Sequence, residues 1–180
     1  MAVGMPARRS VGDLLGTLVR FGLAAVWLVS GAIKAAAPER TYLSVQAFRV
    51  LPDALAGPVA AVLPFVELGL GVLVLFGVGT RVVAALSCLV LLAFVAGITQ
   101  AWARGLSIDC GCFGGGGDVA PGETRYPEEL ARDTGFLALA VWLLVRPRSL
   151  LSVDGWLGLG RPARDGDDGD DRDEPVPAES

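Results

Sequence analysis

Apolar residues are gathered into four long runs along the chain, and shorter polar segments separate these runs. As helices, three of the runs are long enough to cross about 30 Å of hydrocarbon, and the fourth is shorter. The runs cover residues 11–33, 58–78, 82–102 and 130–145. The pattern predicts an all-α integral membrane protein whose four helices form a transmembrane bundle.

The segment between the first two runs, residues 38–57, is too polar to cross a bilayer. Its apolar positions suit an amphipathic helix that lies at the membrane interface: Tyr42, Val45, Phe48, Val50 and Leu51. Two interpretations of this interfacial helix stay open. It is either a lid over the outer face of the bundle or an ordinary connection.

The second and third runs are separated only by a turn around residues 79–81, so their helices are expected to form an antiparallel hairpin. The first run follows two arginines, as a signal peptide does, but it is too long for one and contains Arg20. It is therefore expected to stay in the protein as a membrane span.

Four spans place both termini on the same side of the membrane. Near the ends of the spans, seven Lys and Arg residues lie on the side of the termini and five on the other side. Because positive charge is enriched on the cytoplasmic side, the termini are expected in the cytoplasm. The loop after the third run would then lie outside the cytoplasm, where disulfides persist.

The composition agrees with a membrane protein, since 53% of the residues are hydrophobic and 19% are charged. The last 20 residues differ from the rest and hold eight acidic side chains and three arginines. We therefore expect a cytoplasmic N-terminus over residues 1–10, a membrane domain over residues 11–150 and a disordered acidic tail over residues 151–180. The lipid bilayer is an expected partner, and nucleic acid is not.

The chain contains no histidine. This excludes histidine-based acid-base catalysis, histidine-ligated haem and the usual Cys/His zinc sites. Any chemistry must come from thiols, carboxylates, arginine or lysine.

Cys110 and Cys112 lie one residue apart in the stretch "SIDCGCFGGGGD". Such a pair can close into a small strained disulfide, which constrains the unfolded chain little and is a poor structural link. Strained exposed disulfides are the more oxidising ones, so the spacing favours a redox pair. Two alternatives stay open: a flexible loop with inert cysteines, and a Cu(I) site formed by the two thiolates. The third cysteine, Cys88, lies inside the third run and is expected to be a packing residue.

Charged residues also occur inside the apolar runs. Arg20 lies near the middle of the first run and Glu67 near the middle of the second, where an isolated charge is costly. Because these helices would be antiparallel, the two side chains are expected to reach similar depth and to form an ion pair. Helical spacing places a set of five residues on one face of the first helix: Arg20, Ala24, Trp27, Gly31 and Lys34.

This polar face has two interpretations. One is an ion pair that fixes helix packing. The other is a pocket for a quinone head group, or a proton path from it, with Lys34, Trp27 and Gln100 at its border.

Four stretches together resemble the MauE (methylamine utilisation) family of DoxX-like membrane proteins: "SGAIKAAAP", "YLSVQAFRVLP", "LPFVELGLGVLVLFG" and "DCGCFGG". The resemblance covers residues 14–145, and its most specific part is the cysteine stretch. It implies a four-helix membrane protein linked to redox maturation, in which Cys110 and Cys112 are the redox pair and a thioredoxin-like protein outside the cytoplasm is the partner. The arrangement is also broadly similar to vitamin K epoxide reductase, whose Cys-x-x-Cys motif this sequence lacks.

The sequence therefore predicts a membrane thiol-disulfide redox protein that supports disulfide formation or maturation of exported proteins. In the family this maturation concerns methylamine dehydrogenase. The alternative is a membrane scaffold or assembly factor that only docks a partner.

Overall fold

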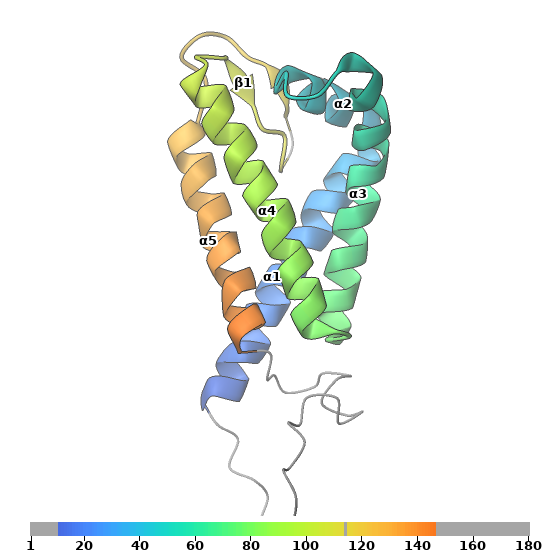
Figure 1. The fold of residues 1–180 in the computed structure, drawn as a ribbon, viewed down its shortest axis with the longest axis vertical. Helices are drawn as coiled ribbons and strands as arrows, with labels where there is room; N and C mark the ends of the chain where they lie inside the picture. The colour runs from blue at the N-terminus through green and yellow to red at the C-terminus, as the bar shows by residue number, and fades with distance from the viewer. Residues whose placement is uncertain (1–10, 114, 147–180) are drawn as a thin grey trace, which may run out of the picture.

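The part of the chain that the structure describes forms five helices and one short β-hairpin (Figure 1). The structure is a computed structural model that describes residues 11–113 and 115–146. The predicted N-terminal segment, residues 1–10, and the predicted acidic tail, residues 151–180, lie outside these residues. The elements are α1 (Val11–Ala36), α2 (Pro38–Ala47), α3 (Asp53–Phe76), α4 (Thr80–Ala103), β1 (Ile108–Asp109), β2 (Gly117–Asp118) and α5 (Tyr126–Val145).

Three helices, α1, α3 and α4, are long and apolar enough to cross a membrane. Large apolar side chains on their outer faces are exposed, including Leu18, Phe65, Val82 and Leu89. An apolar surface of this kind would favour association or precipitation in water, whereas lipid accommodates it. The protein therefore has the surface of a multi-pass membrane protein.

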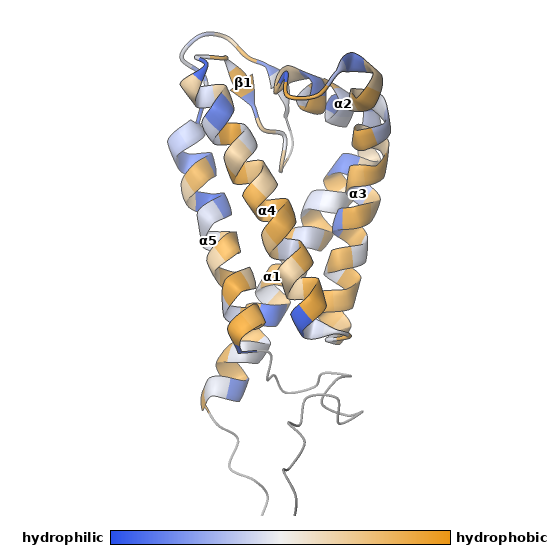
Figure 2. Cartoon of the chain, in the orientation of Figure 1, coloured by the Kyte–Doolittle hydropathy of each residue, from blue (hydrophilic) through white to orange (hydrophobic). Residues whose placement is uncertain are grey.

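The shorter helix α5 differs from the other three long helices. Its first two turns carry four charged residues, and the apolar residues follow them: Glu128, Glu129, Arg132 and Asp133. Figure 2 shows these hydrophilic positions at the upper end of α5 and apolar positions below them. Length and composition therefore identify α1, α3 and α4 as candidate spans, and α5 is not among them.

Helix α1 packs along α3, and α4 packs along α5. Glycines bring α1 and α3 close together, because a Cβ atom at Gly31 would lie 2.9 Å from Leu68 Cγ and one at Gly71 would lie 2.8 Å from Leu28 Cγ. Small residues at a membrane helix interface permit this close approach. The core between the helices includes Leu23, Trp27, Leu70, Leu91 and Leu143.

The predicted helical hairpin is confirmed. Helix α3 ends at Phe76 and α4 begins at Thr80, and the turn between them uses Gly77 and Gly79 in the left-handed region (φ 66° and 57°). Glycine adopts this backbone conformation without the steric cost of a Cβ atom.

The polar segment before α3 forms a shorter helix than its apolar pattern suggested. Helix α2 ends at Ala47, and α3 already begins at Asp53, five residues before the start of the second apolar run. The apolar pattern predicted a helix start at Pro58, but both Pro58 and Pro64 lie inside α3. Membrane helices tolerate internal proline because other groups satisfy the freed backbone positions.

The segment between α4 and α5 contains a β-hairpin that the apolar pattern did not predict. Strands β1 and β2 are antiparallel, with Ile108 opposite Asp118 and Asp109 opposite Gly117. Residues 110–116 therefore form the loop of the hairpin, and this loop contains the Cys-Gly-Cys motif. The hairpin and α2 lie at the same end of the bundle (Figure 1).

Candidate functional site

The glycines around the cysteines allow the hairpin loop to pack against α2. Gly111 and Gly116 have positive φ angles of 69° and 100°. A Cβ atom on either residue would collide with the Oγ atom of Ser44 on α2. The N–H group of Gly111 donates to Asp109 Oδ1 at 2.8 Å, which closes the turn on its other side. The loop is therefore a packed turn in which glycine is required for close approach.

Both cysteines of the motif are buried, although the sequence suggested an exposed loop. Cys110 is 8% exposed and Cys112 is 7% exposed, and both are free thiols. They belong to a cluster of buried residues from α2, α4, β1 and α5: Ala47, Ile98, Ala101, Ile108 and Tyr126. The apolar side of the hairpin folds onto the end of the bundle because this buries its surface.

Tyr126 fixes the hairpin relative to α5. Its hydroxyl group donates to the carbonyl oxygen of Leu106 at 2.6 Å and accepts the N–H group of Ile108 at 3.4 Å. The first turn of α5 therefore holds the start of β1 in place. This contact brings the charged turns of α5 next to the cysteines.

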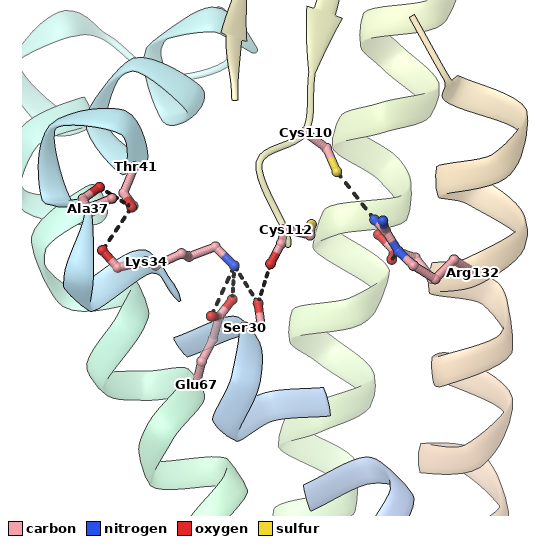
Figure 3. Close-up of polar contacts among 9 residues, drawn as sticks. Ser30, Lys34, Ala37, Thr41, Glu67, Cys110, Cys112 and Arg132 are labelled. Carbon is pink, nitrogen blue, oxygen red and sulfur yellow. Dashed lines mark hydrogen bonds and ion pairs between the residues drawn. The ribbon is translucent and has the colours of Figure 1, made fainter. Parts of the chain in front are cut away.

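Cys110 lies between two charged side chains of α5. The guanidinium of Arg132 donates from Nη2 to Cys110 Sγ at 3.4 Å, and Figure 3 shows the two side chains pointing toward each other. The backbone N–H group of Cys110 donates to Glu129 Oε1 at 3.4 Å. Arg132 is itself oriented by Asp133, whose Oδ1 lies 2.9 Å from Nε, and by the ring of Phe113, 5.0 Å away. A cation held in this way stabilises a thiolate.

The two thiols differ in acidity. The pKa of Cys110 is lowered, mainly because Cys112 donates a hydrogen bond to it and also because Arg132 does, while burial acts in the opposite direction. The pKa of Cys112 is raised well above its usual range, because it is the donor to Cys110 and because it is buried. Cys110 is therefore the more nucleophilic partner, since the thiolate is the reacting species.

A cavity of about 310 Å³ opens onto the two cysteines. One side is formed by the hairpin loop, and the other side is formed by α5 and the residue before it. Its lining residues are Asp109, Cys110, Cys112, Phe113, Arg125, Glu128, Glu129 and Arg132. The cavity gives a reacting group access to thiols that are otherwise buried.

A second polar group lies on the other side of Cys112. Lys34 Nζ contacts both carboxylate oxygens of Glu67, at 2.8 and 3.0 Å, and donates to Ser30 Oγ at 2.6 Å. Ser30 Oγ in turn donates to the carbonyl oxygen of Cys112 at 3.0 Å (Figure 3). The side chains of Lys34 and Glu67 are only 6% and 0% exposed. A buried ion pair is thus connected to the backbone of the cysteine loop.

This geometry corrects the expected partner of Glu67, which was Arg20. Gly31 meets Leu68, and Gly71 meets Leu28, so the antiparallel alignment places Glu67 near the last third of α1. Lys34 is at that level and forms the salt bridge. Arg20 lies 14 residues earlier in the same helix, which is about 21 Å along its axis. The expected pair assumed that the midpoints of the two apolar runs lie at the same depth. However, α3 begins five residues earlier than the second run, and α1 extends to Ala36.

The polar face of α1 does point into the bundle. Its five residues are all buried in the structure: Arg20, Ala24, Trp27, Gly31 and Lys34. Trp27 Nε1 donates to Ser87 Oγ at 3.1 Å, whereas Gln100 Nε2 donates to the carbonyl oxygen of Phe48 at 2.9 Å. Lys34, Trp27 and Gln100 do not line the cavity at the two cysteines.

Sequence reasoning missed the residues of α5 that contact the cysteines. Arg132 and Asp133 follow Glu129 by three and four residues, so all three lie on one side of a helix. Their position, as charged residues just before and at the start of the fourth apolar run, was the sequence signal that could have identified them. The contribution of Ser30 was also missed, because a serine on a membrane helix is common and its partner is distant in sequence.

One group of side chains among the described residues has the spacing of a metal site. Ligand atoms of Asp109, Cys110 and Glu129 lie within 4.8 Å of one another. However, the guanidinium of Arg132 already contacts the Cys110 sulfur. This cation already neutralises part of the negative charge that a metal ion would use at Cys110.

Comparison with known proteins places this chain in a family. The family model described as "Methylamine utilisation protein MauE" matches residues 12–146. Searches of curated proteins and of solved structures found no significant match. The family match covers helices α2 to α5, all of α1 except its first residue, and the Cys-Gly-Cys loop, and it extends over most of the chain. The chain therefore belongs to the MauE family of membrane proteins.

Proposed function

We propose that this protein is a membrane thiol-disulfide redox protein in which Cys110 and Cys112 exchange a disulfide with a thioredoxin-like protein outside the cytoplasm. The observation that carries this proposal is the environment of Cys110. Its sulfur lies 3.4 Å from the Arg132 guanidinium, beside a second thiol, at a cavity of about 310 Å³. A cation next to a thiol that has a neighbouring cysteine is an arrangement suited to thiol-disulfide exchange.

The difference in pKa between the two thiols assigns their roles in the proposed exchange. In the reduced protein, the Cys110 thiolate attacks one sulfur of a partner disulfide, and the other partner sulfur leaves as a thiolate. Cys112 then loses its proton and attacks the Cys110 sulfur of the mixed disulfide. This releases the second partner thiol and forms the Cys110–Cys112 disulfide. The reverse sequence oxidises a partner dithiol, and both directions balance without another reactant.

The proposed arrangement in the membrane is a bundle of four transmembrane helices, α1, α3, α4 and α5, with α2 at the interface. Helix α5 has 20 residues and is about 30 Å long. Its charged turns face the hairpin, so protein groups accommodate those charges at the end of the bundle. We place both termini in the cytoplasm and the hairpin outside it, where a disulfide can persist.

The client in this proposal is an exported protein that needs disulfide bonds. The family is named for methylamine utilisation, so a client of the methylamine dehydrogenase type is one candidate. A quinone is proposed only as the class of membrane-soluble acceptor that reoxidises the pair. The residues expected to border its head group, Lys34, Trp27 and Gln100, do not line the cavity at the cysteines, and the exchange between the cysteines and their partner does not require a quinone.

The experiment that tests this proposal replaces both cysteines in the intact protein. In cells carrying Cys110→Ser and Cys112→Ser together, disulfides of exported client proteins should be lost, as measured by thiol labelling followed by mass spectrometry. Cys88→Ser is the matched control, because Cys88 belongs to the core between the long helices. Unchanged client thiols in the double variant would reject the redox role and support a scaffold that only docks a partner.

A further inference from the structure

The buried ion pair between α1 and α3 is connected to the redox loop through a chain of hydrogen bonds with a defined direction. An ammonium group has three N–H donors, and Lys34 directs two of them to Glu67 and the third to Ser30. The Ser30 oxygen therefore accepts from Lys34, and its own proton is directed to the carbonyl oxygen of Cys112. Without Lys34, this hydroxyl group could instead bond to a carbonyl of the preceding turn of α1.

Close packing of α1 against α3 makes this chain of contacts possible. Ser30 and Lys34 are four residues apart and lie on the same side of α1. Gly31 lies between them in sequence, and a Cβ atom there would come within 2.9 Å of Leu68 Cγ and 3.0 Å of the Pro64 carbonyl oxygen. Glycine at this position lets α3 approach closely enough for Glu67 to reach Lys34.

The carbonyl oxygen of Cys112 and its hydrogen-bond donor both belong to buried residues. The residue is 7% exposed, and Ser30 is 3% exposed. A buried peptide carbonyl needs a hydrogen-bond donor, and Ser30 provides it in the structure with free thiols. A disulfide between Cys110 and Cys112 imposes a torsion angle of about 90° and a short separation of the two Cα atoms, so it can move the residue that carries this carbonyl.

We propose that Lys34 and Ser30 are positioning residues that hold the reduced form of the Cys110–Cys112 turn and thereby set its redox equilibrium. Glu67 anchors Lys34, so the ion pair inside the bundle takes part in the redox site. The positive charge of Lys34 also acts on the thiol itself. Contact with Cys110 and burial raise the pKa of Cys112, and Lys34 acts in the opposite direction.

This inference rests on the proposed redox role of the two cysteines, but its test needs no partner protein. The full chain, carrying Cys88→Ala so that only two thiols are counted, is placed in lipid nanodiscs. It is equilibrated with mixtures of reduced and oxidised glutathione. The fraction of Cys110–Cys112 disulfide is then measured by maleimide mass labelling, which gives an equilibrium constant.

Ser30→Ala should shift this constant about fivefold toward the disulfide, the effect of losing one hydrogen bond to the reduced form. Ser30→Thr keeps the hydroxyl group and should restore the original value. Ser87→Ala is the matched control, because Ser87 is also a buried serine and contacts Trp27 away from the loop. Lys34→Met should shift the constant in the same direction as Ser30→Ala. Its folded yield is expected to fall, because it leaves Glu67 without its cation.

The decisive result comes from Ser30→Ala, which keeps the ion pair intact. A constant within twofold of the Ser87→Ala control would overturn the inference. A shift in this constant together with unchanged client thiols in the double cysteine variant would reject the proposed function and retain the positioning role. Loss of client disulfides in the double cysteine variant, without a shift of the equilibrium constant in Ser30→Ala, would reject the positioning role and retain the proposed function.

Discussion

The guanidinium of Arg132 lies 3.4 Å from the sulfur of Cys110, although the two residues are 22 positions apart in the sequence. The hairpin supplies the thiol, and α5 supplies the cation. Asp133 Oδ1 lies 2.9 Å from Nε of Arg132, and the guanidinium stacks over the ring of Phe113. The acidity of Cys110 therefore depends on how the hairpin packs against α5.

Replacement of Arg132 should make Cys110 less reactive at neutral pH. Arg132→Gln removes a cation that favours the thiolate, so the pKa of Cys110 should rise and its titration should move to higher pH. The rate of iodoacetamide modification at pH 7 should fall about fivefold, as expected for a contribution near 1 kcal/mol from a partly exposed charge. Measurement of this rate across a pH series gives the shift.

Arg125→Gln is the control for this change. Arg125 lines the same cavity, but its side chain is 77% exposed and pairs with Glu128. Its loss should leave the pH profile nearly unchanged. Equal shifts in the two variants would mean that general positive charge in the cavity, rather than the contact of Arg132 with the sulfur, controls Cys110.

The second thiol should affect Cys110 even before any disulfide forms. The hydrogen bond from Cys112 is the largest cause of the lowered pKa of Cys110. Cys112→Ala removes the donor, whereas Cys112→Ser keeps a hydroxyl donor in its place. The pH midpoint of Cys110 alkylation should therefore rise more in the alanine variant than in the serine variant. Identical midpoints would show that the neighbouring donor has no influence on the thiolate.

Thiol labelling should also reveal the orientation of the chain in the membrane. If the hairpin lies outside the cytoplasm, a small membrane-impermeant thiol reagent applied to reduced intact cells should modify Cys110 or Cys112 through the cavity that both line. Cys88 should be spared, because it lies in the apolar core of the long helices. The Cys110→Ser and Cys112→Ser double variant should lose the label. Labelling that appears only after permeabilisation would place the hairpin in the cytoplasm.

The sequence predicted the apolar helices well because a membrane span requires a long and nearly uninterrupted apolar run. The turn at Gly79 was recognisable for the same reason, since two such runs stop on either side of it. Helix starts were less predictable. Pro58 signalled the beginning of a helix, yet it lies inside α3, five residues after the first residue of that helix.

The candidate site was only partly predictable. The cysteines stood out by their spacing, but nothing local showed that Gly111 and Gly116 pack against Ser44, or that Arg132 contacts the thiol. Which charge neutralises Glu67 depends on the axial offset between two helices. The glycines at the α1–α3 interface set that offset, and their contacts are visible only in three dimensions.

The salt bridge between Lys34 and Glu67 should make a large contribution to the free energy of unfolding of the bundle. Lys34→Met leaves a carboxylate in an apolar surrounding, and Glu67→Gln leaves an ammonium group there. Each single change should cost about 3 kcal/mol, because a buried charge without its partner is strongly unfavourable. The double change leaves neither charge behind and should cost less than the sum of the singles. Thermal unfolding of the three variants in lipid nanodiscs measures the coupling.

An exposed pair in the same protein provides the comparison for this last prediction. Arg49 and Asp118 lie 3.8 Å apart, with side chains 59% and 73% exposed. Their removal should cost less than about 1 kcal/mol, singly or together, because water screens both charges. If the Lys34 and Glu67 changes are additive, as expected for the exposed pair, the two buried groups do not depend on each other. Strong coupling at the buried pair alone would show that the salt bridge is a structural unit of the α1–α3 interface, to which Ser30 and the cysteine loop are attached.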